Sequence, residues 1–186
     1  MAKNYIGLDI EANEIYMANG GKCVFMQMPE NLVKDGKIVS PESLAKFLKT
    51  MKKEGSIGGK NISLILPDDA TYFRNVVSPV VSDAQLRLNL PYEFRDFVGS
   101  NSIDYNYDYV VSSYNKDENG DVTGINILAA AANKESVEEY FNILKRAGLK
   151  LKCALPREMA LINIMENVDE NKEYCLIGIG YNHSNV

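Results

Sequence analysis

The hydrophobic pattern at the start of the chain predicts strands before helices. Residues 5–10 form an apolar segment with an acid, Asp9, near its end, and residues 14–18 and 22–28 are two more segments of strand length. Gly20-Gly21 lies between the last two segments, and a Gly-Gly pair at this spacing is typical of a two-residue β-hairpin turn. We therefore predict a buried strand followed by a tight hairpin.

Two helices are predicted to begin near residues 40 and 82. Ser40 is expected to cap the first helix with its hydroxyl, and Pro41 suits the first helical position, where an N–H would have no partner in any case. Ser82 and Gln85 form a capping-box pattern at the start of the second helix. Pro91 lies well inside the second pattern and predicts a kink or a break near it.

The rest of the chain predicts a long hairpin, a helix and a return to strands. Two strands over residues 103–113 and 122–132 are joined by a cluster of polar turn residues. Asn133 is expected to cap the next helix, and Gly148 is expected to end it in a left-handed conformation. The predicted elements that follow are a strand over 149–155, a helix over 156–166 and a strand over 174–180. Together they predict an α/β fold in which α and β elements are mixed.

The last predicted strand, residues 174–180, is apolar on both faces, as a central strand of a continuing sheet would be. Only six residues follow it, so we expect a chain that ends in mid-fold and a strand that lacks its natural neighbours. An exposed apolar strand edge invites pairing with another chain. The sequence thus predicts a homo-oligomer contact through residues 174–180.

Composition and charge narrow the classes of function. The net charge is −5, and because no basic stripe is present to neutralise phosphates, we expect no nucleic-acid partner. Apolar runs are all far shorter than the ~20 residues that span a bilayer, so we expect no direct membrane insertion and a cytoplasmic location. A single histidine and three dispersed cysteines predict neither a metal site nor a disulfide framework; these residues are His183, Cys23, Cys153 and Cys175.

Five segments follow one another along the chain in a characteristic order. They are Ile6-Gly7-Leu8-Asp9-Ile10, the stretch 62–67, the stretch 82–98 with the aromatic strand 103–107, the stretch 128–131 with 137–140 and 147–149, and Leu176-Ile177-Gly178-Ile179-Gly180. Together, by order and spacing, they resemble the N-terminal half of the PilM family, the actin-like proteins of type IV pilus assembly. The resemblance extends more loosely to the actin-like relative FtsA.

The resemblance implies an actin-like (RNase H-like) subdomain with a smaller subdomain inserted into it. Residues 1–67 and 155–171 correspond to the actin-like subdomain. Residues 68–154 correspond to the insertion, with strand–helix–strand–strand–helix–strand order. Residues 173–186 correspond to the first strand of a second actin-like half, which is otherwise missing from this chain.

In actin-like ATPases, two turns of the form Asp-x-Gly hold the nucleotide phosphates, with Mg²⁺ near the aspartates. In the first turn here, Asp9 keeps the carboxylate but Glu11 stands where the glycine is expected, and its negative charge repels a triphosphate. In the second turn, Gly180 keeps the glycine but Gly178 replaces the aspartate. The degenerate phosphate loops implied by the resemblance are Asp9, Glu11, Ala12 and Asn13 in the first turn, with Gly178 and Gly180 in the second.

The loss of the glycine at Glu11 and of the aspartate at Gly178 argues against ATP hydrolysis. We expect no cofactor in this chain, whereas a full-length relative could bind ATP and Mg²⁺. No catalytic residue set is apparent, because a single histidine leaves no plausible Ser-His-Asp or Cys-His arrangement. Two rival functions stay open: an ATPase or sugar-kinase-like phosphotransferase with altered loops, and an FtsA-like cell-division filament protein.

The resemblance also implies a protein partner, the N-terminal peptide of a PilN-like membrane protein, which would hold the chain at the periphery of the inner membrane. Residues 91–97 concentrate aromatic residues and an arginine, which are frequent anchors of interfaces. The predicted partner-binding residues are Tyr92, Phe94, Arg95 and Phe97, where the inserted subdomain meets the actin-like one. Phe94 and Phe97 are equally well explained as core residues of a short helix.

Overall fold

Contacts within the chain divide the protein into two compact units. The large unit comprises Met1–Pro67 and Phe141–Val186, and the small unit comprises Asp68–Tyr140. A computed structural model describes residues 5–11, 13–34, 37–162, 174–179 and 184–185.

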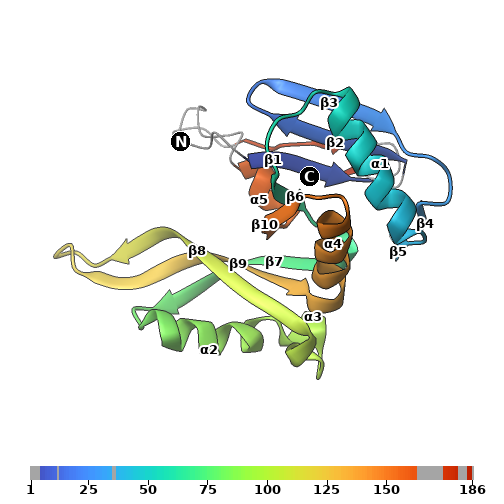
Figure 1. The fold of residues 1–186 in the computed structure, drawn as a ribbon. Helices are drawn as coiled ribbons and strands as arrows, with labels where there is room; N and C mark the ends of the chain where they lie inside the picture. Colours follow the sequence, from blue (N-terminus) through green and yellow to red (C-terminus); the bar gives the residue numbers. More distant parts are fainter. Residues whose placement is uncertain (1–4, 12, 35–36, 163–173, 180–183, 186) are drawn as a thin grey trace. The chain divides into compact units, whose positions relative to one another are not determined.

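The large unit is built on one five-stranded sheet (Figure 1). Its strands are β1 (Tyr5–Ile10), β2 (Glu14–Asn19), β3 (Lys22–Gln27), β6 (Asn61–Ile65) and β10 (Lys150–Leu155), in the spatial order β10-β6-β1-β2-β3. β6 pairs in parallel with both β1 and β10, whereas β1, β2 and β3 pair antiparallel. The predicted hairpin between β2 and β3 is confirmed: Gly20 and Gly21 have φ angles of 56° and 90°, which glycine adopts without a steric penalty.

Helix α1 (Pro41–Glu54) supplies an apolar face to the large unit, in which Leu48 and Met51 are completely buried. Pro41 occupies the first turn of the helix, as predicted. The predicted side-chain cap is wrong, because the Ser40 hydroxyl bonds Oγ of Ser43 at 2.9 Å and caps no backbone N–H. This helix therefore begins with the favourable backbone geometry of proline but without a hydroxyl cap.

Helix α4 (Lys134–Arg146) begins in the small unit and ends in the large one. Its predicted cap is confirmed, because the backbone N–H of Ser136 donates to Oδ1 of Asn133 at 3.0 Å. Its predicted end is also confirmed by Gly148, whose φ angle of 74° lies in the left-handed region.

The small unit is a three-stranded antiparallel sheet with two helices along one face (Figure 1). Its strands are β7 (Thr71–Pro79), β8 (Tyr105–Lys116) and β9 (Val122–Asn133), in the spatial order β7-β9-β8. The helices are α2 (Asp83–Glu93) and α3 (Arg95–Val98). The predicted long hairpin is thus confirmed as β8 and β9.

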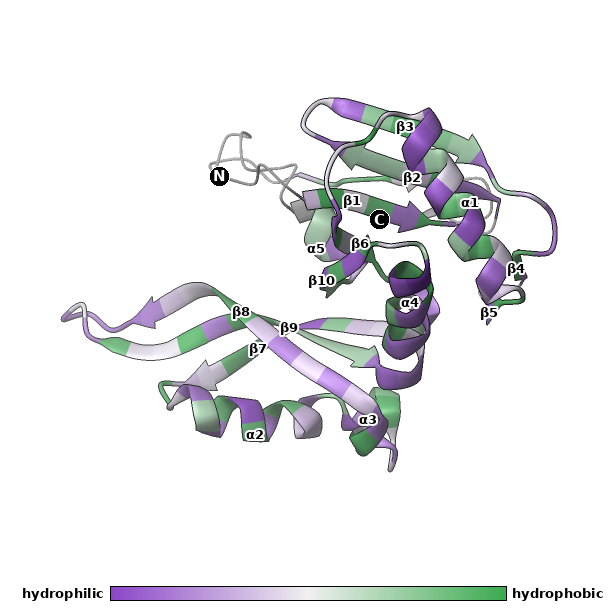
Figure 2. Ribbon diagram, viewed as in Figure 1, coloured by the Kyte–Doolittle hydropathy of each residue, from purple (hydrophilic) through white to green (hydrophobic). Residues whose placement is uncertain are grey.

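Helix α2 carries both hydrophobic and hydrophilic bands (Figure 2). Its buried residues Leu86 and Leu90 join one hydrophobic cluster with Ile127 of β9, which anchors the helix to the sheet. The helix continues through Pro91 and ends at Glu93, so the predicted break falls just beyond the proline. A short turn of helix then resumes as α3.

The expected inserted subdomain, residues 68–154, differs from the compact small unit, which ends at Tyr140. The difference arises because β10 pairs in parallel with β6 of the large unit, with Lys150 opposite Asn61. A parallel pair needs a long crossover, and α4 supplies the last part of it. The end of α4 and the whole of β10 therefore belong with the large unit.

The predicted strand over residues 174–180 is wrong for Tyr174 to Ile177, which have no strand pairing. Only β11 (Gly178–Ile179) is extended, and it pairs with β12 (Ser184–Asn185); Gly180 lies outside the described residues. A homo-oligomer contact through this segment stays a prediction. The remaining described elements are β4 (Val33–Lys34), β5 (Lys37–Ile38), α5 (Arg157–Ile162) and two 3₁₀ turns at Asp68–Ala70 and Ser102–Asp104.

Replacing Ser82 with alanine should lower the free energy of unfolding of the small unit by about 1 kcal/mol, because the capping box at α2 would lose its hydroxyl. The matched control is Ser40→Ala at α1, where the hydroxyl caps no backbone N–H and the expected change is within about 0.5 kcal/mol. Urea denaturation of both variants measures the difference. Equal losses at the two serines would contradict the cap assignment.

Candidate functional site

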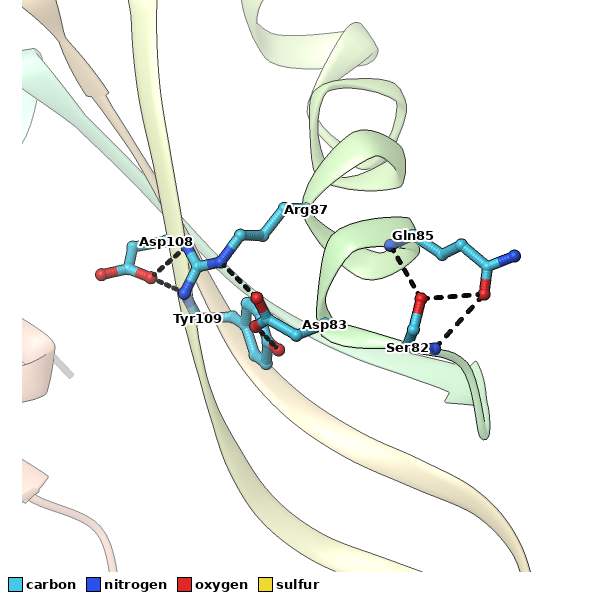
Figure 3. Close-up of polar contacts among 6 residues, drawn as sticks. All are labelled: Ser82, Asp83, Gln85, Arg87, Asp108 and Tyr109. Atoms are coloured by element: carbon cyan, nitrogen blue, oxygen red, sulfur yellow. Dashed lines mark hydrogen bonds and ion pairs between the residues drawn. The ribbon is translucent and has the colours of Figure 1, made fainter.

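The candidate site lies on the small unit, where α2 ends and α3 begins, and its position depends on how α2 is fixed. Ser82 accepts a hydrogen bond from the backbone N–H of Gln85 at 3.3 Å, and Oε1 of Gln85 accepts one from the backbone N–H of Ser82 at 3.3 Å (Figure 3). These reciprocal bonds satisfy two of the free donors at the start of the helix. The predicted capping box is therefore confirmed, and it fixes where α2 starts.

A polar cluster then ties the first turns of α2 to strand β8 (Figure 3). Nε of Arg87 lies 3.0 Å from Oδ2 of Asp83, and Nη1 of Arg87 lies 3.1 Å from Oδ1 of Asp108. The hydroxyl of Tyr109 donates to Oδ1 of Asp83 at 2.6 Å, and the Arg87 guanidinium stands 5.3 Å from the centre of the Tyr109 ring. These contacts set the orientation of α2 on β8, although exposed ion pairs add little stability.

The contacts in this cluster shift the pKa values of Asp83 and Tyr109. The hydrogen bond from Tyr109, followed by the one from Arg87, lowers the pKa of Asp83. The bond to Asp83 in turn raises the pKa of Tyr109. Around neutral pH the carboxylate therefore stays charged and the phenol stays protonated, which is the pair of states that the hydrogen bond requires.

The end of α2 is held by the side chain of Arg74 and by the aromatic ring of Phe97. Nη1 of Arg74, on β7, donates to the backbone carbonyl of Glu93, one of the last carbonyls of the helix. Its guanidinium also lies 5.9 Å from the centre of the Phe97 ring. The Phe97 ring packs 5.3 Å from Tyr72 and 6.3 Å from Phe94, measured between ring centroids. The α2–α3 junction is thus supported from the sheet side.

A cavity of about 430 Å³ opens at this junction. Leu88 and Tyr92, one helical turn apart on α2, are 72% and 71% exposed and form an apolar wall. Arg95 contributes a positive charge, and two serines contribute hydroxyls. The lining residues are Leu88, Pro91, Tyr92, Arg95, Gly99, Ser100 and Ser102.

The structure separates the four predicted partner-binding residues. Tyr92 and Arg95 line the cavity. Phe94 is completely buried in the hydrophobic cluster of the small unit, so it cannot touch a partner unless the unit rearranges. Phe97 is 49% exposed and packs sideways on Tyr72 and under Arg74.

Sequence reasoning missed the rest of the cavity wall. Leu88 resembles any other apolar position of a helix, and its place four residues before Tyr92 was the available signal. Gly99, Ser100 and Ser102 are ordinary loop residues in sequence. They join the wall because the chain turns after α3, where Gly99 has a positive φ angle of 59°.

A second set of candidate residues, the acids of the first degenerate phosphate loop, lies in the large unit. Nη1 and Nη2 of Arg157, the first residue of α5, lie 2.7 Å and 3.1 Å from the two carboxylate oxygens of Asp9. The same Nη1 lies 3.4 Å from Oε1 of Glu11. The three side chains are only 14–16% exposed. We refer to Asp9, Glu11 and Arg157 as the arginine clamp.

The other predicted loop residues play backbone roles where they are described. The carbonyl of Asn13 accepts a hydrogen bond from the N–H of Met28 at 2.7 Å. Gly178 lies in β11, while Ala12 and Gly180 lie outside the described residues. Arg157 itself was missed, because it is separated from Asp9 by 148 positions and its sequence context gives no sign of a partner.

One family and several solved structures match this chain. The family described as type IV pilus assembly protein PilM matches residues 10–186. A chain of the PilM–PilN type IV pilus biogenesis complex has a TM-score of 0.74 at 18% identity, over 89% of this chain and 51% of that chain. The cytoplasmic domain of EpsL, an inner-membrane component of the type II secretion system of Vibrio cholerae, has a TM-score of 0.53 at 12% identity, over 82% of this chain and 56% of that chain.

A weaker likeness, with a TM-score of 0.43 at 10% identity over 88% of this chain and 56% of the other, is to a Bacteroides thetaiotaomicron protein of unknown function with an actin-like ATPase fold. No curated protein matches the sequence. This chain spans about half the length of the solved chains that it matches. The predicted mixed α/β fold class is confirmed by the order of helices and strands and by the likeness to the solved PilM chain.

Proposed function

The chain belongs to the PilM family of type IV pilus assembly proteins, and on that premise we propose that it is an assembly scaffold that holds a peptide segment of a PilN-like membrane protein. The observation that carries the proposal is the cavity at the α2–α3 junction, with exposed Tyr92 and Leu88 beside Arg95. Large exposed apolar side chains around a hollow are a common feature of binding surfaces.

The chemistry of the cavity suits a short peptide. Leu88, Pro91 and Tyr92 offer apolar area for one or two side chains. Aromatic and arginine side chains are frequent interface anchors, because they bury a large area at a modest loss of conformational entropy. Arg95 can donate to peptide carbonyls or to a carboxylate while its aliphatic stem packs against the apolar wall.

The surroundings of the cavity favour binding without rearrangement. The capping box, the polar cluster around Arg87 and the Arg74 contact hold α2 at its start, middle and end. A pre-ordered surface loses less entropy when it binds than a mobile one does. These contacts therefore support a scaffold role.

In this proposal the chain works on the cytoplasmic side of the inner membrane and reaches the membrane through its partner. Among the described residues, no helix is long and apolar enough to cross a bilayer. A partner that carries a membrane-spanning segment would hold the chain at the inner membrane. The chain would then link that partner to cytoplasmic components of the pilus machinery.

Arg95→Glu is the test of this site. The substitution reverses the charge in the cavity and should weaken binding by about 1–3 kcal/mol, which is roughly 5- to 150-fold in Kd. Binding is measured by titrating a labelled N-terminal peptide of the PilN-like protein, with circular dichroism as the folding control. Unchanged affinity in a folded variant would remove Arg95 from the site, and no binding by the wild type would remove the scaffold proposal in this form.

A matched pair of tyrosines controls for nonspecific effects. Tyr92 and Tyr114 both belong to the small unit and are 71% and 61% exposed, but only Tyr92 lines the cavity. Tyr92→Ala should weaken peptide binding, whereas Tyr114→Ala should leave it unchanged. Equal effects would place the peptide somewhere other than the α2–α3 junction.

A further inference from the structure

The arginine clamp occupies the place where the resemblance to actin-like ATPases puts nucleotide phosphates and Mg²⁺. Both carboxylate oxygens of Asp9 are engaged by the Arg157 guanidinium at 2.7 Å and 3.1 Å, so a positive charge already stands beside this carboxylate where a metal ion would otherwise supply one. Glu11 stands beside the same nitrogen at 3.4 Å. A carboxylate next to a phosphate is repulsive, and strongly so where the exposed fraction is only 14%.

The neighbouring strand reinforces this negative environment. Tyr16 of β2 lies opposite Asp9 of β1, and its hydroxyl donates to Oε2 of Glu14 at 2.5 Å. This hydrogen bond, burial, and the charges of Glu14, Glu11 and Asp9 raise the pKa of Tyr16 to about 12. The carboxylates of Glu14, Glu11 and Asp9 that surround this strand also disfavour a triphosphate by like-charge repulsion. The residues of this loop therefore do not fit a Mg²⁺–nucleotide.

We propose that the Arg157 guanidinium is the loop's own counter-cation, and that the fold of the large unit consequently requires neither ATP nor Mg²⁺. Asp9 and Glu11 would repel each other if left without a positive charge, and a guanidinium can bind the first in bidentate fashion while it touches the second. The clamp joins the end of β1 to the start of α5, so it also fixes α5 against the sheet. This inference stands apart from the partner site, which belongs to the small unit.

A charge-removal cycle in the intact chain tests the arginine clamp. Arg157→Ala should lower the Tm by about 10 °C, because two poorly exposed carboxylates lose their counter-charge. Glu11→Gln should shift the Tm in opposite directions in two backgrounds. It should lower the Tm of the wild type slightly, because a contact with Arg157 is lost. It should raise the Tm of Arg157→Ala, because the repulsion between Glu11 and Asp9 is removed. A side chain that merely packs would shift the Tm in the same direction in both backgrounds, and that result would overturn the proposal.

Two further variants, Arg157→Lys and Arg146→Ala, complete the test. Arg157→Lys keeps the charge but loses the bidentate geometry, so its Tm should lie between those of the wild type and Arg157→Ala. If the alanine variant does not fold, Arg157→Lys is compared with the wild type alone, and an equal Tm would overturn the proposal. The control is Arg146→Ala, an exposed arginine 3.6 Å from Glu42, for which a Tm change of at most about 2 °C is expected. A loss at Arg157 no larger than that at Arg146 would also overturn the proposal.

Nucleotide provides the last readout. Millimolar Mg²⁺–ATP should leave the wild-type Tm unchanged, whereas a ligand held far above its Kd raises the Tm by several degrees. Displacement of a fluorescent ATP analogue gives an independent measure of the same binding. An ATP-dependent rise in Tm, or saturable displacement, would show that a nucleotide reaches the site despite the clamp.

Discussion

Replacing Phe94 with alanine should lower the free energy of unfolding of the small unit by about 3–5 kcal/mol. Phe94 is completely buried, and its ring lies 5.7 Å from Tyr107 and 6.3 Å from Phe97 between centroids. Truncation would leave a cavity between α2 and the sheet. Both helices and the rings of Tyr107 and Phe97 would border this cavity. A unit of this size has little stability in reserve, so the loss should be sufficient to unfold much of it.

The matched control for Phe94 is Leu88, which belongs to the same helix pair but is 72% exposed. Leu88→Ala should change the free energy of unfolding by no more than about 0.5 kcal/mol, as is usual for surface positions. Urea denaturation followed by circular dichroism gives both values. A loss at Phe94 no larger than that at Leu88 would contradict the assignment of Phe94 to the core of the small unit.

Asp9→Ala should lower the free energy of unfolding of the large unit by about 3 kcal/mol, because it removes the bidentate partner of a poorly exposed guanidinium. The result would assign Asp9 to folding, although its position in the chain suggests a metal or phosphate role. The comparison variant is Glu42→Ala. Its ion pair with Arg146 is 3.6 Å long and more than half exposed on both sides, so the expected loss is within about 0.5 kcal/mol.

A double-mutant cycle separates the Asp9–Arg157 interaction from the separate effects of the two side chains. The loss in the Asp9→Ala/Arg157→Ala variant should be clearly smaller than the sum of the two single losses, because each single variant leaves a partly buried charge without its partner. Additive losses would contradict a direct interaction. Chemical denaturation of the four proteins supplies all the values that the cycle needs.

The elements themselves were largely predictable because their signals are local. Gly20-Gly21 marked the first hairpin, Ser82 and Gln85 marked the start of α2, and Gly148 marked the end of α4. Each of these features depends on the backbone freedom of one residue or on a hydrogen bond that spans three positions. Ser40 shows the limit of this reasoning, because its hydroxyl had a competing acceptor in Ser43 that the pattern could not rank.

The sequence by itself determined the order of strands and helices up to residue 162, the actin-like resemblance and the presence of Glu11 where a phosphate-loop glycine is expected. Only the tertiary structure decided which side chains of residues 88–97 face the core, because helix phase past Pro91 depends on packing against the sheet. It buried Phe94 and left Leu88, Tyr92 and Arg95 around the cavity. It also brought Arg157 to Asp9 across 148 positions, a contact that parallel pairing of β10 with β6 and the turn into α5 create, and that no local pattern encodes.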